Sequence, residues 1–193
     1  MKRRAGAAGL NLWISLIVML YACEAEPEFI TRFHIPKGEH YALPRSVESL
    51  QRNHLVFTAT FDSSAVYHLD NKAYQDSKNK LLGFSDCNSL HRVNSARFAW
   101  QWFNERLEIF AYCYVNGVRV EEFIGSVELN KPHHYSITCT AEHYVFRLDA
   151  HEPVVIRRGN VCDKGWYYML WPYFGGSQPA PHDIRITIKR YYW

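Results

Sequence analysis

The sequence lacks a large excess of charge of either sign. It has 22 lysines and arginines against 19 aspartates and glutamates, a formal net charge of +3, and the basic residues are scattered along the chain. Binding to nucleic acid usually needs basic residues gathered in one run or stripe. We therefore expect no nucleic-acid partner.

Spacings typical of a zinc site are also absent. No two of the ten histidines are four residues apart, and no Cys-x-x-Cys occurs. His133 and His134 are adjacent, and neighbouring residues of a strand point to opposite faces. Convincing amphipathic helices, with apolar residues every three or four positions, are missing too. These absences argue against zinc chemistry and against a helical fold.

A long apolar stretch occurs only near the N-terminus. There "AGLNLWISLIVML" follows three basic residues and is too short for a comfortable membrane span, which predicts an export signal over residues 1–22. The adjoining "LYAC" resembles the lipobox of bacterial lipoproteins, and this resemblance implies lipidation of Cys23. The alternative is an ordinary signal peptide with an incidental cysteine. The acidic "CEAEPE" is similar to the tag of lipoproteins that reach the cell surface, so we expect an exported protein anchored by lipid in the outer membrane.

The remainder of the chain divides into two parts. Residues 23–53 contain three prolines and show little periodicity, which predicts a tether and an N-terminal lead-in. Residues 54–193 contain short segments rich in β-branched and aromatic residues, separated by turn residues. The length left after removal of the signal, about 170 residues, fits one domain.

Strand and turn signals define the expected fold. Asn116-Gly117 is the strongest turn signal, because a type I′ hairpin turn requires positive φ at both central residues. Strands about ten residues apart with tight turns predict an all-β fold, a two-sheet antiparallel β-sandwich of the jelly-roll type. The expected strands are "HLVFTATF", "AVYHL", "KLLGFSDC", "SARFAWQWF", "RLEIFAYCYV", "RVEEFIGSVEL", "HHYSITCT", "HYVFRLD", "EPVVIRR", "WYYMLWPYF" and "DIRITIKRYYW".

Alternation predicts which residues of each strand are buried. In "RLEIFAYCYV" one face carries aliphatic residues and a cysteine, and in "DIRITIKR" one face carries three isoleucines. We expect both of these faces in the core. They consist of Leu107, Ile109, Ala111, Cys113 and Val115 in the first strand, and of Ile184, Ile186 and Ile188 in the second.

The opposite face of the middle strands mixes rings with polar groups. Such a face suits sugars, whose C–H surfaces stack on rings while their hydroxyls need hydrogen-bonding partners. The strand before it would add either Arg97 and Gln101 or Trp100 and Trp102, and the Gly-Gly and Pro loop near the C-terminus would form a rim. The alternative is that this face is covered and its rings are ordinary core. The candidate ligand-binding residues are Arg97, Trp100, Gln101, Trp102, Glu108, Tyr112, Tyr114, Trp171, Tyr173 and His182.

Two segments resemble a known superfamily. "HHYSITCTAEHYVFRLDAHEPVVIRR" is similar to consecutive strands of concanavalin A-like jelly rolls, and "WPYFGGSQPAPHDIRITI" is similar to their closing section. The ending "PYFGGSQPAPHDI" also resembles a motif of small bacterial surface lipoproteins of this superfamily. The resemblance implies a jelly roll over residues 54–193. It leaves activity open, because lectins, carbohydrate-binding modules, glycoside hydrolases and polysaccharide lyases share the fold.

Catalytic motifs of the superfamily are absent. No E-x-D-x-E occurs, Ala99 stands where a lyase-type R-x-E would place a glutamate after Arg97, and no Q-x-H follows. We therefore expect a non-catalytic protein that binds glycan. A polysaccharide lyase using Arg97, Gln101, His182 and Tyr173 is one alternative, as is a glycoside hydrolase, and a structural subunit of a surface assembly is another.

A structural calcium ion is implied by the same resemblance. Asp183 opens the final strand, where many sandwiches of this kind hold Ca²⁺. Asp62, which follows an early strand, is expected to supply further oxygen ligands for the same ion. The alternative for Asp183 is a turn residue that hydrogen-bonds its own loop.

Four cysteines follow Cys23. Cys113 and Cys139 share faces with apolar residues and are expected in the core. Cys87 and Cys162 fall in loops and can pair if their Cα atoms lie within about 7 Å. The sequence does not fix the pairing.

Overall fold

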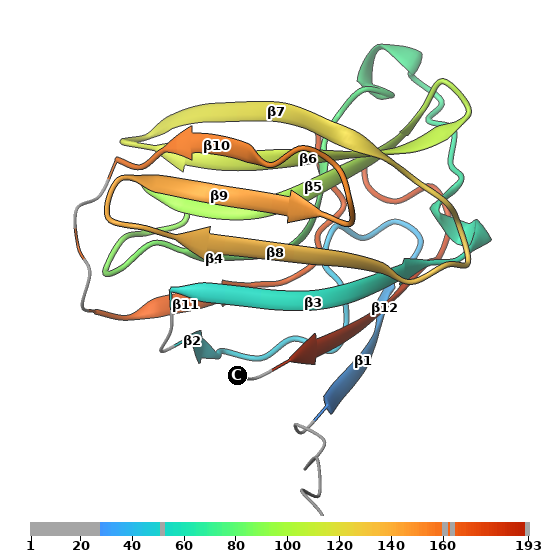
Figure 1. Ribbon diagram of the computed structural model, residues 1–193. Coiled ribbons are helices and arrows are strands. Elements are labelled where there is room, and N and C mark those ends of the chain that lie inside the picture. The colour runs from blue at the N-terminus through green and yellow to red at the C-terminus, as the bar shows by residue number, and fades with distance from the viewer. Residues whose placement is uncertain (1–27, 51–52, 160–161, 163–164, 192–193) are drawn as a thin grey trace, which may run out of the picture.

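Two six-stranded antiparallel sheets pack face to face, as Figure 1 shows. The computed structural model describes residues 28–50, 53–159, 162 and 165–191. Within these ranges the secondary structure is β apart from two single-turn 3-10 helices, Ser63–Ala65 and Lys72–Tyr74. No helix there is long and apolar enough to span a bilayer. The predicted antiparallel sandwich is confirmed.

Sheet A lies in front in Figure 1 and sheet B behind it. Sheet A has the order β1 (Glu28–Ile35), β12 (Ile184–Tyr191), β3 (His54–Phe61), β8 (His133–Cys139), β9 (His143–Leu148), β10 (Val154–Arg157). Sheet B has the order β2 (Ser49–Leu50), β11 (Tyr167–Leu170), β4 (Asn79–Ser85), β5 (Ser95–Phe103), β6 (Arg106–Val115), β7 (Val118–Val127).

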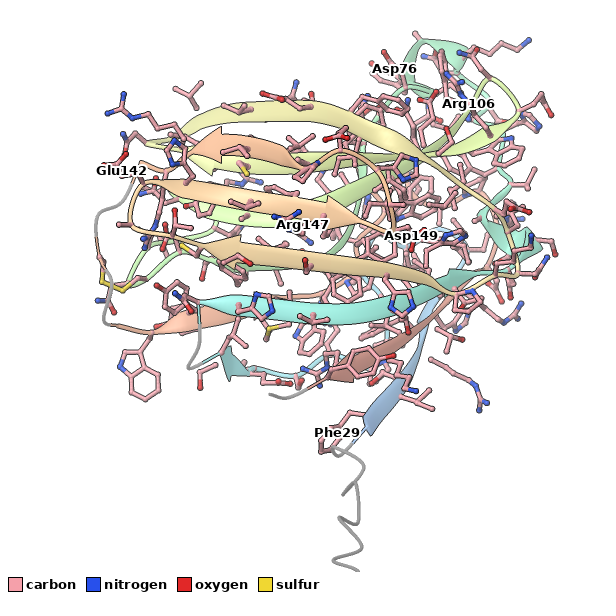
Figure 2. All side chains as sticks on the ribbon, viewed as in Figure 1. Phe29, Asp76, Arg106, Glu142, Arg147 and Asp149 are labelled. Carbon is pink, nitrogen blue, oxygen red and sulfur yellow. A yellow bond between two sulfur atoms is a disulfide. The ribbon has the colours of Figure 1, made fainter. Side chains whose placement is uncertain are left out.

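The sandwich begins earlier than the sequence suggested. The lead-in expected to be irregular supplies β1, which pairs along its whole length with β12 at the edge of sheet A. Phe33 and Ile35 are its two buried residues, opposite Ile186 and Ile184. Two inward-facing residues are too few to give a recognisable alternating pattern in the sequence. Figure 2 places Phe29, near the start of this strand, at the lower end of the molecule.

One expected strand, "AVYHL", is not a strand. Asp62 caps the 3-10 helix Ser63–Ala65 by accepting from the Ser64 amide at 2.8 Å. Beyond it, Tyr67 and Leu69 are buried, and that alternation imitates a strand. The side chain of Gln75 serves this backbone in place of a neighbouring strand, because it donates to Tyr67 O and accepts from the Leu69 amide.

Aromatic rings fill the space between the sheets. Phe98 of β5 meets Phe57 of β3 and Phe146 of β9 edge to face, with ring centroids 5.9 and 5.2 Å apart. Such pairs add to the hydrophobic gain of burial. Ile109 and Ile186, expected in the core, are 0% and 1% exposed. The inward faces of β6 and β12 are therefore those that alternation predicts.

A buried ion pair and a disulfide lie together at one end of the core. Asp86 is fully buried and accepts from Arg158 Nε at 2.6 Å and from the Tyr144 hydroxyl at 2.5 Å. Next to it, Cys87 and Cys162 form a disulfide, a pairing that the sequence had left open. The free cysteines, Cys113 and Cys139, are buried as expected.

Asp86→Ala is expected to lower the free energy of unfolding by about 3–5 kcal/mol, because it leaves Arg158 buried without its counter-ion. Urea denaturation measures the change. The matched control is Arg185→Ala, which breaks an exposed ion pair with Asp183 and should cost no more than about 1 kcal/mol. A loss in Asp86→Ala as small as that in the control would contradict this account.

Candidate functional site

The pairing of β5 with its neighbours decides which side chains face away from sheet A. Arg97 lies opposite Tyr112 of β6, and Ala99 lies opposite Phe110. Side chains of a strand alternate between its two faces, so Arg97, Ala99 and Gln101 share one face of β5. This face is the outer face of sheet B, which points away from sheet A. Of the two pairs that the sequence left open, Arg97 with Gln101 is the outward one.

Trp100 and Trp102, both candidate ligand-binding residues, face the core instead. Trp100 is fully buried, and its ring lies 5.2 Å from that of Phe61 and 5.9 Å from that of Tyr67. Trp102 packs against the same core. Their assignment to a binding surface is wrong, because the register of β5 turns even-numbered residues inward.

A cavity of about 490 Å³ opens on the outer face of sheet B. It brings together five of the candidate residues, which come from β5, from β6 and from the segment after β11: Arg97, Tyr112, Tyr114, Trp171 and Tyr173. It also includes side chains that the sequence analysis did not single out, among them Tyr41, Arg45, Lys80, His91 and Arg92. The lining therefore combines five basic side chains with aromatic rings, and it contains no carboxylate.

Two of the basic groups in the cavity are partly buried and, among the residues described, form no ion pair. Arg97 donates from Nη2 to Trp171 O at 2.7 Å, and its buried Nε has no partner. Lys80 Nζ donates to Lys78 O at 2.7 Å and lies 4.8 Å from the centroid of the Tyr112 ring. Across the described ranges, neither cation forms an ion pair.

Burial shifts the ionisation of both groups. Loss of water, followed by the charge of Arg97, lowers the pKa of Lys80 to about 8, although Glu121 opposes the shift. Burial lowers the pKa of Arg97 to about 10. Both shifts arise mainly because these groups have lost hydration, and the charge of Glu121, which forms no ion pair with Lys80, offsets only part of the shift there. A carboxylate in the cavity would relieve the repulsion and meet the planar fork of a guanidinium, which binds such groups bidentately.

Tyrosines form much of the remaining wall. The Tyr173 ring stacks on His40 at 5.3 Å and meets the Tyr41 ring edge-on at 5.1 Å. Burial raises the pKa of Tyr112 to about 12 and also raises the pKa of Tyr173. These hydroxyls are therefore neutral near pH 7, when they can donate and accept hydrogen bonds.

Three other candidate residues do not line the cavity. Gln101 and Glu108 are buried and bonded to each other at 2.7 Å, and Glu108 also pairs with Arg106. His182 lies with its Nε2 2.8 Å from the carbonyl of Ser64. The Gly-Gly loop nevertheless contributes to the rim as expected, through Gly176.

The carboxylates expected to hold calcium are engaged by protein donors. Asp183 accepts from the Lys37 amide at 3.0 Å and pairs with His34 at 3.2 Å, and Asp62 accepts from the Ser64 amide. No group of three or more His, Cys, Asp or Glu side chains suited to a metal occurs in the described part of the chain. The contacts of Asp183 differ from the turn role weighed as the alternative, because Lys37 and His34 belong to a distant segment of the chain and not to its own loop. Asp62 caps the 3-10 helix Ser63–Ala65.

The sequence matches no known protein family and no curated protein. Solved structures do resemble this one. The alginate lyase AlyC3 has a TM-score of 0.55 at 12% identity, covering 83% of this chain and 72% of its own. SCLam, a non-specific endo-β-1,3(4)-glucanase of family GH16, has a TM-score of 0.54 at 12% identity, with coverages of 86% and 71%.

The laminarinase catalytic domain from Thermotoga maritima MSB8 has a TM-score of 0.54 at 10% identity, and the match covers 83% of this chain and 76% of that domain. The protein has the concanavalin A-like jelly-roll fold. This confirms the superfamily resemblance as far as architecture is concerned. Fold alone does not carry an activity over at such identities. Cys23, on which the lipoprotein resemblance rests, lies outside the described residues.

Proposed function

We propose that this jelly roll binds an acidic glycan in the cavity on sheet B and does not cleave it. The observation that carries the proposal is the pair of desolvated cations, Lys80 and Arg97, which have no carboxylate partner in the cavity. A ligand carboxylate, as in a uronic acid, supplies the missing charge.

The rest of the cavity wall suits a sugar. Pyranose rings present C–H faces that pack on aromatic side chains, and their hydroxyls need donors and acceptors nearby. Tyr112, Tyr114 and Tyr173 offer both a ring and a neutral hydroxyl in the same lining. The solved structures of this fold named above include an alginate lyase and an endo-β-1,3(4)-glucanase, which supports a polysaccharide ligand in general.

The geometry does not favour cleavage. Of the four residues expected for a lyase, Arg97 and Tyr173 line the cavity, whereas Gln101 and His182 are engaged elsewhere. A tyrosine base would need a lowered pKa, and burial raises that of Tyr173. A glycosidase needs two carboxyl groups flanking the bond, and the lining offers none.

A role as an assembly subunit is less well supported by this surface. Protein interfaces are broad, with a largely apolar centre. The rings here instead surround a concave site with charged groups at its base. Concave sites with a few converging polar groups are typical of small ligands.

Isothermal titration calorimetry with uronate oligomers, sulfated oligomers and neutral β-glucan oligomers tests the function. We expect uronate oligomers to bind and neutral ones not to bind. Arg97→Met and Lys80→Met should each weaken binding by roughly 10- to 100-fold, the equivalent of about 1.5–3 kcal/mol for a charged hydrogen bond. Lys72→Met, at an exposed lysine, is the control and should bind as wild type. Equal binding of neutral oligomers, or full affinity in both cavity variants, would refute the proposal.

The affinity should also fall as the pH rises past about 8, the pKa of Lys80 in the free protein. A bound carboxylate raises that pKa, so below it Lys80 is charged in both states and the affinity is constant. Above it, binding must take up a proton, and the affinity falls by up to about tenfold per pH unit. Lys80→Arg, which keeps its charge, should show a flat profile over the same range. A wild-type affinity that is independent of pH would count against the role of Lys80.

We also propose that the protein is exported and held in the outer membrane by lipid on Cys23. The disulfide Cys87–Cys162 supports an oxidising compartment. Labelled palmitate should be incorporated by wild type and by Cys113→Ala during expression in a Gram-negative host. Cys23→Ser should lose the label and leave the membrane fraction. Label that persists in Cys23→Ser would exclude this site.

A further inference from the structure

Side chains form transverse rows on the outer face of sheet B. Each row crosses β4, β5 and β6, and β5 carries Ser95, Arg97, Ala99 and Gln101 in successive rows. Lys80 lies in the row of Ala99, and the bridge between Lys80 and Tyr173 extends that row to the cavity wall. The cavity thus runs along β5 from Ser95 past Arg97 to the row that contains Lys80, a length of ~14 Å at 3.4 Å per residue.

The end of the cavity near Ser95 is open. His91 and Arg92 are exposed there, and the Ser95 hydroxyl donates to the carbonyl of His91 at 2.7 Å. Tyr168 of β11 and Tyr114 of β6 belong to the same row, on either side of Ser85 and Ser95. Of this row, Ser95 and Tyr114 line the cavity and form the floor of its mouth.

The opposite end is closed. Gln101 and Glu108 point away from sheet A and yet are only 3% and 5% exposed. Phe110, one row nearer the cavity, is 9% exposed and lies beneath Lys78, whose Nζ is 4.5 Å from the ring centroid. Some part of the chain must therefore cover this end of the outer face.

Two loops that contact each other form this cover. The Gly175 amide donates to Asn79 Oδ1 at 2.7 Å, and a Cβ at Gly175 would lie 2.0 Å from Lys78 O, so only glycine permits this approach. Gly176 has φ +78°, a conformation that also favours glycine, and it lies against Ser77. The Gly-Gly sequence is therefore required for the closure.

The covering loop is also fixed to the end of β5. Gln75 Nε2 donates to the carbonyl of Trp102 at 2.9 Å. Figure 2 places Asp76, the next residue, at the same end of the molecule as Arg106, the first residue of β6. The cover therefore lies over the ends of β5 and β6 where Gln101 and Glu108 are buried.

We propose that the cavity takes the end of an acidic glycan chain, with the carboxylate of the terminal residue against Lys80 and Arg97, and that the chain leaves over His91 and Arg92. This inference rests on the proposed function and specifies the ligand further. The interior of a chain would have to continue past Lys80, where the contact between Gly175 and Lys78 closes the path. The mouth remains basic, because Arg92 is exposed there.

Binding stoichiometry as a function of chain length tests this inference on the wild-type protein. If one end of each chain enters, a chain binds one protein molecule at every length, from short uronate oligomers to the polymer. If the interior binds, the number of protein molecules per chain grows with length, and the inference is overturned. Absence of any uronate binding would instead refute the proposed function itself, so the two failures are distinguishable.

Two variants separate the deep end from the mouth. Lys80→Met should weaken the binding of a uronate dimer and of a longer oligomer by the same factor, because both ligands place their terminal carboxylate against Lys80. Arg92→Ala should weaken binding of the longer oligomer by a larger factor than binding of the dimer, because only the longer chain continues over Arg92 beyond the mouth. Equal losses for both ligands in Arg92→Ala would contradict the placement of the chain. Near-ultraviolet circular dichroism of each variant verifies that the fold is intact.

Discussion

The packing of aromatic rings between the two sheets is the constraint on which the functional surface depends. Phe98 and Trp100 of β5 are fully buried, and their rings pack against Phe146 and Phe61 of the opposite sheet. Because side chains of a strand alternate, fixing these two inward fixes Arg97 outward. A slip of one residue would bury a guanidinium between the sheets and expose two large rings. The core therefore specifies the position of the cation as firmly as any contact within the cavity.

The cavity carries a local cost that the core offsets. Two cations that have lost hydration without forming an ion pair make folding less favourable. The free energy gained from hydrophobic burial elsewhere in the protein offsets this cost. Sites that bind charged ligands commonly contain residues that are unfavourable for stability, and these residues are retained because the function needs them. Asp86 and Arg158 are the contrasting case, since their charges satisfy each other within the core.

Alternation predicted most of the architecture and only part of the site. β5 and β6 match their expected bounds, and the inward face of β6 is the one inferred from its aliphatic residues. Lys80 was not identified because an irregularity between Lys80 and Gly83 adds a residue to β4. Counting back by twos from buried Phe84 assigns Lys80 to the core, and the bulge reverses that assignment. Tyr41 and Arg45 were missed because their segment was taken for a tether.

The disulfide has a consequence for the shape of the cavity mouth. It joins two segments 75 residues apart, one leading to His91 and Arg92 and the other to β11 and Trp171. Hydrogen bonds between Asn88 and Trp166 reinforce this link. The two walls are thus joined covalently near their bases, and their separation is set before the proposed ligand binds. Binding then requires little rearrangement of the protein, and most of the conformational entropy lost on binding is lost by the ligand.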